Sequence, residues 1–214
     1  SQPIKHDSAV AALGFSPNGD YLAVAEQDAV TIWRIGEDVR ALATTPLAGR
    51  PVALSWSPGQ TKLGIGFEAG GAAVLRVDQG EMTTFTDYPS AVRSIVWSPA
   101  GDIMATSGAF RIIAWPLDDL KTNGAQPASL ETGKPSLVTV EALAVHPKRP
   151  LIAAGYESGM LIITELGKRD ELMIRAEGGG AITRIAWSRC GSFLALGSEG
   201  GLAAIVELPA QLFK

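Results

Sequence analysis

Short apolar segments alternate with glycine- and proline-containing turns along the whole chain, and one arrangement of them occurs five times. In each copy a first apolar segment ends at an anchor side chain, a turn follows, and a second apolar run comes directly after the turn. The anchors are Phe15, Trp56, Trp97, Val145 and Trp187, which recur after 41, 41, 48 and 42 residues. We therefore expect five repeats of one structural unit, near residues 9–48, 51–88, 91–136, 139–178 and 181–214.

Each repeat contains strand-length segments of different character. The second segments are nearly continuous apolar runs, which indicates burial on both faces of a sheet. The fourth segments are more polar, as suits an outer edge that must not pair with other molecules. The predicted second strands are 21–25, 63–67, 151–154 and 193–196, the third strands are 30–33, 72–75, 111–115, 161–164 and 203–206, and the fourth strands are 40–45, 81–86 and 171–175. A period of about 40–45 residues with four short strands is typical of a propeller blade, so the sequence predicts an all-β propeller of five four-stranded blades in a single domain, 1–214.

Proline and glycine set the turns between these strands. Ser-Pro ends the first strand in several repeats, because proline donates no backbone hydrogen bond and presets a turn. Glu-x-Gly turns that start at Glu68, Glu157 and Glu199 separate second from third strands. The three-residue step from Val92 to Ile95 predicts a β-bulge in the first strand, and the shorter second repeat is expected to lack one.

The arrangement strand–FSPNGD–strand–turn–IW, read from Phe15 to Trp33, resembles the WD40 repeat, and versions of it recur in all five copies. The family's Gly-His is represented by Lys5-His6, and no repeat keeps the aspartate of its Trp-Asp ending. The family's Asp-His-Ser-Trp side-chain network is therefore expected to be largely absent. Packing must then supply more of the stability, at roughly 1.5–3 kcal/mol for each fully buried large apolar side chain. The resemblance implies structural roles for His6, Phe15, Trp33, Trp56, Trp97, Trp115 and Trp187, and the alanine- and glycine-rich style is similar to bacterial members of the family.

Five blades allow two arrangements. The chain could close as a five-bladed ring, or it could form part of a seven-bladed propeller, the commonest ring in the WD40 family. Two partial candidates for one outer strand, Pro3–Lys5 and Ala210–Phe213, favour the second arrangement. An incomplete ring would expose apolar blade faces, so self-association through those blades or retention of a partner fragment is expected.

Charge and composition exclude several classes of protein. The net charge is −4, from 18 basic and 22 acidic residues, and no block of like charge occurs. A nucleic-acid binder would show a concentrated basic face, so no nucleic-acid partner is expected. No apolar run is long enough to span a membrane, and no signal-peptide pattern begins the chain. Cys190 is the single cysteine, which fits a reducing compartment, and we expect a cytoplasmic protein without membrane contact.

Residues with catalytic or ligand chemistry are few. His6 and His146 occupy positions beside strands and turns, and with one cysteine they form no zinc spacing. No serine-hydrolase elbow, zinc-protease motif or phosphate loop appears. Gly64–Gly66 is interpreted as a packing feature inside a strand, and Gly178–Gly180 as a flexible connection in preference to an anion-binding nest. We expect no catalytic residue, no cofactor and no metal, with a cation held by the recurrent glutamates as the alternative.

A polar insertion, Asp118–Pro135, distinguishes the third repeat. It is interpreted as a solvated connection, and a functional loop is the alternative.

The leading hypothesis for function is a non-catalytic scaffold for protein–protein interaction. In the WD40 family, partners often meet the face formed by the loops before the first strands and by the turns between second and third strands. Tyr88, Arg93 and Tyr156 are the preferred anchors there, because aromatic and arginine side chains dominate interface energetics, and ordinary packing is their alternative role. The positions carried over to this chain are Asp7, Arg50, Phe67, Tyr88, Arg93, Glu141 and Tyr156.

A five-bladed propeller that binds or hydrolyses a carbohydrate through its central funnel is the alternative function. Aromatic residues make up only 7% of the chain, which is sparse for stacking on sugars, and no acidic pair stands out from the blade pattern.

Overall fold

The computed structural model describes residues 3–6, 8–117 and 126–209, and these contain nineteen β-strands and no helix. The strands form five antiparallel sheets, of which the first four have four strands and the last has three. Within each sheet the strands neighbour one another in chain order, as expected for propeller blades. The predicted all-β, propeller-type stack of sheets is confirmed, although the described part of sheet 5 has three strands where four were predicted.

The strand bounds follow the sequence pattern closely. Sheet 1 holds β1 (Ala12–Phe15), β2 (Tyr21–Ala25), β3 (Ala29–Arg34) and β4 (Arg40–Pro46). Sheet 2 holds β5 (Pro51–Trp56), β6 (Lys62–Phe67), β7 (Ala72–Arg76) and β8 (Glu81–Phe85). Sheet 3 holds β9 (Ile95–Trp97), β10 (Ile103–Thr106), β11 (Ile112–Pro116) and β12 (Leu130–Thr132). Sheet 4 holds β13 (Val140–Val145), β14 (Leu151–Tyr156), β15 (Leu161–Glu165) and β16 (Glu171–Arg175), and sheet 5 holds β17 (Ile182–Trp187), β18 (Phe193–Ser198) and β19 (Ala203–Glu207).

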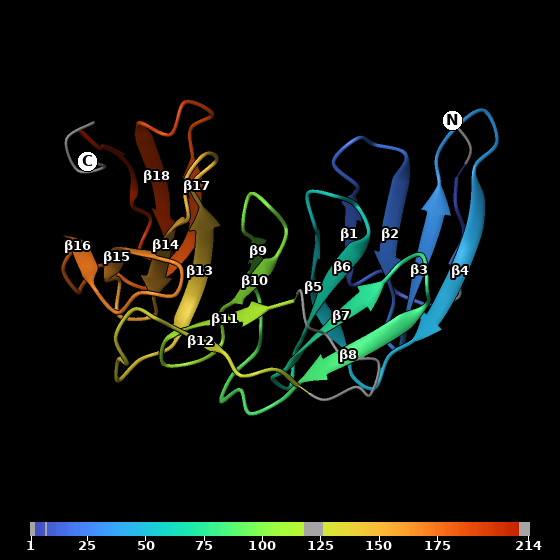
Figure 1. Ribbon diagram of the computed structural model, residues 1–214, viewed down its shortest axis with the longest axis horizontal. Coiled ribbons are helices and arrows are strands. Elements are labelled where there is room, and N and C mark those ends of the chain that lie inside the picture. The colour runs from blue at the N-terminus through green and yellow to red at the C-terminus, as the bar shows by residue number, and fades with distance from the viewer. Residues whose placement is uncertain (1–2, 7, 118–125, 210–214) are drawn as a thin grey trace.

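The sheets follow one another along a curved row, with the blue sheet 1 and the orange-red sheet 5 at its two ends (Figure 1). Each first strand packs against the first strand of the next sheet, from β1 through β5, β9 and β13 to β17. The first strands therefore lie innermost, and the fourth strands form the outer edge.

The hydrophobic core lies between the sheets. Four clusters of buried side chains each combine residues of two successive sheets. The anchors Trp56 and Trp97 are 8% and 7% exposed within two of these clusters. Phe15 is 59% exposed, because no described sheet precedes sheet 1 to cover it.

The row of sheets is open. Within the described part of the chain, no extensive strand contact joins sheet 1 to sheet 5. Apolar side chains on the two end sheets stay exposed, including Leu13 on β1 and Ile205, which is 74% exposed, on β19. The surfaces that would meet in a closed ring of these five sheets are thus both accessible.

One prediction about the strands was wrong. The second repeat does contain a β-bulge, because the pairing of β5 with β6 shifts register between Pro51 and Ala53. Equivalent shifts occur in β13 and β17. Proline has no N–H to give to a ladder, so Pro51 is suited to an irregular position at the start of the strand.

The third repeat contains a strand whose position the sequence pattern did not predict. Its fourth strand, β12, lies inside the polar stretch 118–135 and pairs with β11. Residues 118–125 of that stretch lie outside the described residues. Its described end is therefore partly an element of the sheet and not only a connection.

Two glycine motifs serve close packing. A Cβ on Gly66 would lie 2.0 Å from the backbone oxygen of Val92, which agrees with the packing role expected for Gly64–Gly66. The segment Gly178–Gly180 also packs backbone against backbone: a Cβ on Gly200 would lie 2.3 Å from the oxygen of Gly179. Close approach between neighbouring turns, together with positive φ at all three residues, therefore explains this glycine run.

Candidate functional site

A pocket of about 730 Å³ opens between sheets 3, 4 and 5, where the chain enters their first strands. Arg93 lies just before β9, Glu141 lies on β13, and Thr183 and Arg184 lie on β17. The turns between second and third strands complete the pocket. The full lining is Arg93, Glu141, Glu157, Ala181, Thr183, Arg184 and Glu199.

The lining of this inner pocket combines two arginines with three glutamates and contains no aromatic residue. Arg93 and Arg184 are exposed, so both guanidinium groups can reach a bound molecule. The hydroxyl of Thr139 lies between two of the carboxylates, 3.0 Å from Glu141 Oε1 and 3.3 Å from Glu157 Oε2. Such a mixed lining suits polar and charged groups of a protein surface.

The recurrent glutamates pair with residues of their own blade. Glu68 Oε2 accepts from Arg50 Nη1 at 3.2 Å, and the backbone N–H of Glu68 donates to the oxygen of Arg50 at 3.0 Å. Glu157 makes the equivalent contacts with Thr139, eighteen positions earlier in the chain. The glutamates thus fix the turn to the start of the first strand. Among the described residues, no group of three or more His, Cys, Asp or Glu side chains is arranged to hold a metal ion.

Sheet 1 carries a fourth copy of this glutamate that sequence reasoning missed. Glu26 accepts hydrogen bonds from the Ser8 hydroxyl at 2.7 Å and lies 2.7 Å from His6 Nδ1. The Ser8 hydroxyl first, and then His6, lower the pKa of Glu26. The spacing of 42 residues from Glu26 to Glu68 could have found it. His6 Nδ1 and the Ser8 hydroxyl thus both contact the Glu26 carboxylate.

Phe67 and Tyr88 both line a second pocket, of about 410 Å³, at one end of sheet 2. The hydroxyl of Tyr88 lies 2.6 Å from Thr106 Oγ1 and accepts a hydrogen bond from Trp115 Nε1 at 2.7 Å. Burial raises the pKa of Tyr88 to about 12. Tyr88 therefore occupies the place that a histidine takes in sheet 1, and its polar end is directed into the protein.

The remaining residues that were predicted to bind a partner lie in different parts of the structure. Tyr156 is 1% exposed and lies in the core between sheets 3 and 4, where burial raises its pKa. Arg50 is exposed and paired with Glu68. Asp7 lies outside the described residues. The structure thus brings Arg93 and Glu141 together in the inner pocket, joins Phe67 with Tyr88 elsewhere, and places Tyr156 inside the fold.

Four residues in or beside the inner pocket were not predicted: Thr139, Ala181, Thr183 and Arg184. Each stands at or beside the start of a first strand, the same repeat position that singled out Arg93 and Glu141. Aligning the repeats at their first strands, and not only at aromatic and charged positions, would have identified them.

Two further predictions concern reactive groups. His146 is buried in its turn, its Nδ1 accepts from the backbone N–H of Lys148 at 3.0 Å, and its ring packs edge-on against Trp187. Cys190 is exposed in the turn after β17, and a hydrogen bond with Ser188 is the main cause that lowers its thiol pKa to about 7.

In the part of the chain that the structure describes, no helix is long and apolar enough to cross a membrane.

Comparison with known proteins supports the fold. The family model described as "WD domain, G-beta repeat" matches residues 3–34 and 80–115. A solved structure titled "Structure of U3-55K" superposes with a TM-score of 0.73 over 96% of this chain at 16% sequence identity. The chain spans 63% of the length of that solved chain. No curated protein sequence matches the chain.

Proposed function

Because the chain is a WD40-repeat chain with a propeller-type stack of sheets, we propose that it is a non-catalytic scaffold that binds a protein partner at the inner pocket. The observation that carries this proposal is the convergence of side chains from three sheets on one pocket of about 730 Å³. No single repeat supplies them, so the pocket exists only when sheets 3, 4 and 5 are stacked.

The chemistry of the pocket supports a protein ligand in preference to a sugar. Its lining offers two guanidinium groups and three carboxylates but no aromatic ring on which a sugar could stack. Arginine is enriched at energetically dominant interface positions, and its planar fork binds carboxylates through two parallel hydrogen bonds. Arg93 and Arg184 are therefore the side chains expected to anchor the partner, with Glu141 as the nearby acceptor.

Affinity capture with this chain as bait tests the proposal. Proteins retained from an extract of the source cells are identified, and the affinity of each is then measured for the wild type and for the double variant Arg93→Ala, Arg184→Ala. Loss of two anchoring guanidinium groups is expected to weaken binding at least about tenfold, which corresponds to about 1.4 kcal/mol.

A matched control replaces two exposed arginines away from the pocket, Arg34→Ala and Arg189→Ala. This control keeps the same net charge as the pocket variant and should bind as the wild type does. Equal weakening by both double variants would show that general charge, not the inner pocket, holds the partner. If both double variants bind the partner with full affinity, the partner does not bind at the inner pocket.

A further inference from the structure

Two large apolar side chains in the loops around sheets 3 and 4 lie outside the core. Phe110, in the turn between β10 and β11, is 47% exposed, and Leu137, in the connection from β12 to β13, is 97% exposed. Neither belongs to any of the four core clusters of the described chain. Single exposed apolar residues need no explanation, whereas apolar residues that gather into one patch mark interaction sites.

Backbone hydrogen bonds hold these two loops side by side. The N–H of Ser136, next to Leu137, donates to the oxygen of Phe110 at 2.7 Å. The N–H of Val140 donates to the oxygen of Ala109 at 2.9 Å. Phe110 and Leu137 therefore belong to one patch on a pair of loops whose backbones are fixed to each other.

A pocket of about 570 Å³, here termed the outer pocket, lies at this patch. Pro89, Phe110 and Pro135 line it and are exposed, so a ligand can reach its apolar wall. Proline rings and a phenyl ring offer flat apolar surfaces on which an aromatic side chain can pack. The full lining is Asp87, Tyr88, Pro89, Ala109, Phe110, Arg111, Ile113 and Pro135.

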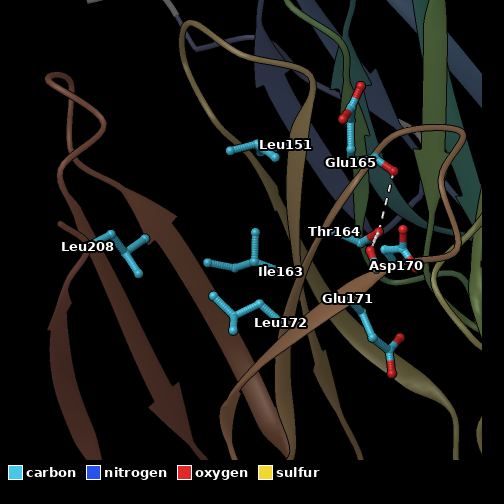
Figure 2. Close-up of a pocket in the computed structure, with 8 residues that line it drawn as sticks. All are labelled: Leu151, Ile163, Thr164, Glu165, Asp170, Glu171, Leu172 and Leu208. Atoms are coloured by element: carbon cyan, nitrogen blue, oxygen red, sulfur yellow. Dashed lines mark hydrogen bonds between the residues drawn. The ribbon is translucent and has the colours of Figure 1, made fainter. Parts of the chain in front are cut away.

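The groove between sheets 4 and 5 in Figure 2 shows a contrasting case. It measures about 250 Å³, and its apolar side chains are Leu151, Ile163, Leu172 and Leu208. Ile163 and Leu208 are members of the core cluster between these two sheets, and Leu151 packs against that cluster. That groove is thus a margin of the core, whereas the outer pocket is lined by Phe110, which packs into no core cluster.

Charge at the outer pocket favours an acidic ligand. Arg111 is half-buried in the lining, and no described residue accepts a hydrogen bond from its guanidinium group. A hydrogen bond from Arg169, at 2.5 Å, is the main cause that lowers the pKa of Glu131 on β12, and the charge of Arg111 contributes less. Asp87 accepts a hydrogen bond from the Thr86 hydroxyl at 3.3 Å. The guanidinium of Arg111 is therefore the charged group left to bind a carboxylate, which its planar fork can do through two parallel hydrogen bonds.

Tyr88 supplies no polar recognition in the outer pocket. Its hydroxyl is bound inside the protein by Thr106 and Trp115. A proline-rich ligand docks on grooves lined with aromatic side chains, and it would meet one exposed phenyl ring here. An aromatic side chain next to a carboxylate matches both the apolar wall and Arg111.

We propose that the outer pocket binds an extended segment of a partner protein in which an aromatic side chain is flanked by aspartate or glutamate. The aromatic ring packs on Phe110, Pro89 and Pro135, Leu137 covers its outer edge, and a flanking carboxylate binds Arg111. Aromatic anchors in pockets carry much of the binding energy of protein interfaces. The inference rests on the proposed scaffold function only in taking a protein as the ligand, and it does not require the inner pocket.

A synthetic peptide provides the direct test. The probe is the labelled peptide Ser-Asp-Glu-Phe-Glu-Asp-Ser, and its binding to the whole chain is followed by fluorescence anisotropy. Saturable binding that weakens with added salt is expected. Replacing the phenylalanine by serine, or the four acidic residues by lysine, should weaken binding at least about tenfold. In hydrogen exchange, the peptide should slow exchange of amides in the turn 107–111.

Phe110→Ala should reduce the affinity for the peptide at least about tenfold, because the ring loses its packing surface. Phe193→Ala is the matched control, since Phe193 is a similarly exposed phenylalanine, at 41%, on β18. Leu137→Ser should weaken binding about threefold without a change in thermal stability, because the leucine side chain has no core contact to lose. Arg111→Ala should lower both the affinity and its dependence on salt, whereas Arg34→Ala should change neither.

Several results would overturn the proposal. They are absence of peptide binding, equal binding of the serine or lysine peptide, and equal effects of Phe110→Ala and Phe193→Ala. Weakening by Phe110→Ala with full affinity in both Leu137→Ser and Arg111→Ala would also contradict it, because loss of structure alone would then explain the result. Self-association of the free chain that Phe110→Ala disrupts would replace the partner segment by a second copy.

Double variants separate the outer pocket from the inner pocket. Arg93→Ala, Arg184→Ala and the distant control Arg34→Ala, Arg189→Ala each remove two positive charges, so both should bind the peptide alike. Loss of peptide binding at Phe110→Ala and loss of partner binding at the inner-pocket arginines therefore report on different surfaces. Either proposal can fail without the other.

Discussion

The indole Nε1 of Trp97 donates a hydrogen bond to the backbone oxygen of Ser55 in the preceding sheet, at 3.1 Å. The same bond joins Trp56 to Gly14 at 2.9 Å and Trp187 to Ala144 at 3.0 Å. Each acceptor stands one residue before the anchor of its own sheet. Three of the four boundaries between sheets are therefore held by one repeated polar contact in addition to apolar packing.

The boundary between sheets 3 and 4 uses another contact, because its anchor, Val145, has no donor. Here Ser94 Oγ accepts a hydrogen bond from the backbone N–H of Leu143 at 3.0 Å. Polar contacts between neighbouring sheets therefore add to apolar packing at all four boundaries, including the two boundaries that the inner pocket spans.

Replacing Trp97 by phenylalanine should lower the free energy of unfolding by about 1–2 kcal/mol, because the Ser55 oxygen loses its partner in a half-buried setting. Urea denaturation followed by circular dichroism measures the change. Trp33→Phe is the matched control, since Trp33 Nε1 is buried without a hydrogen-bond partner among the described residues. Trp33→Phe should lower the free energy of unfolding clearly less than Trp97→Phe does. A larger loss at Trp33 than at Trp97 would contradict the role given to the indole bond.

Two glycines in strands differ in how closely a neighbouring sheet covers them. A Cβ on Gly155 of β14 would lie 2.4 Å from Ile182 Cγ2 in sheet 5, whereas a Cβ on Gly197 of β18 would meet nothing closer than 3.9 Å. Gly155→Ala should therefore destabilise the protein by roughly 1–3 kcal/mol through overpacking. Gly197→Ala should change thermal stability little or raise it. Similar losses in both variants would mean that another surface covers sheet 5 in solution.

Gln60 stores strain in the turn of sheet 2. Its φ is 60°, in the region where the equivalent turns use Gly19 and Gly101, and its side-chain oxygen is buried without a partner in the described structure. Gln60→Gly should raise the free energy of unfolding by about 1 kcal/mol, because a side chain in this conformation costs more than the added freedom of glycine. Thermal unfolding would measure this gain in stability.

The reverse substitution, Gly19→Ala, should lower the free energy of unfolding by about 1 kcal/mol. Its Cβ meets no atom within 4 Å, so only the backbone is strained.

Stability at alkaline pH should depend on Tyr88. Burial raises the pKa of its phenol to about 12 from an ordinary value of 10, so the folded protein holds this proton more tightly than the unfolded chain does. The resulting stability is fully present below pH 10 and is lost as the pH rises toward 12, by roughly 2–3 kcal/mol. Denaturation at a series of pH values measures this loss. Tyr88→Phe should reduce the slope in this range; an unchanged slope would contradict the burial of the phenol.

Most of the strands could be predicted from the sequence, because proline, glycine and the apolar runs mark each repeat directly. The predicted third strand 30–33 lies within β3, and the predicted fourth strand 171–175 coincides with β16. β12 was missed because its three residues lie in a polar stretch with no apolar run. The bulge in β5 was missed because Val52, Leu54 and Trp56 follow one another in regular steps of two, whereas the register shifts between Pro51 and Ala53.

The inner pocket could be predicted only in part. The repeat positions of Arg93 and Glu141 placed them on one face, and the structure brings them into one pocket. Tyr88, in the connection before β9, and Tyr156, the last residue of β14, turn into the protein, where Tyr88 takes the place of a histidine and Tyr156 fills the core. The spacing of the strands fixes where a residue lies along a repeat, whereas the direction of its side chain depends on contacts with the neighbouring sheet.

Hydrogen exchange of the chain with and without its captured partner tests the scaffold account most directly. Binding at the inner pocket should slow exchange of amides around Arg93, Glu141 and Thr183, while the outer strand β4 exchanges as before. Protection confined to outer strands, with no change where the chain enters β9, β13 and β17, would contradict it.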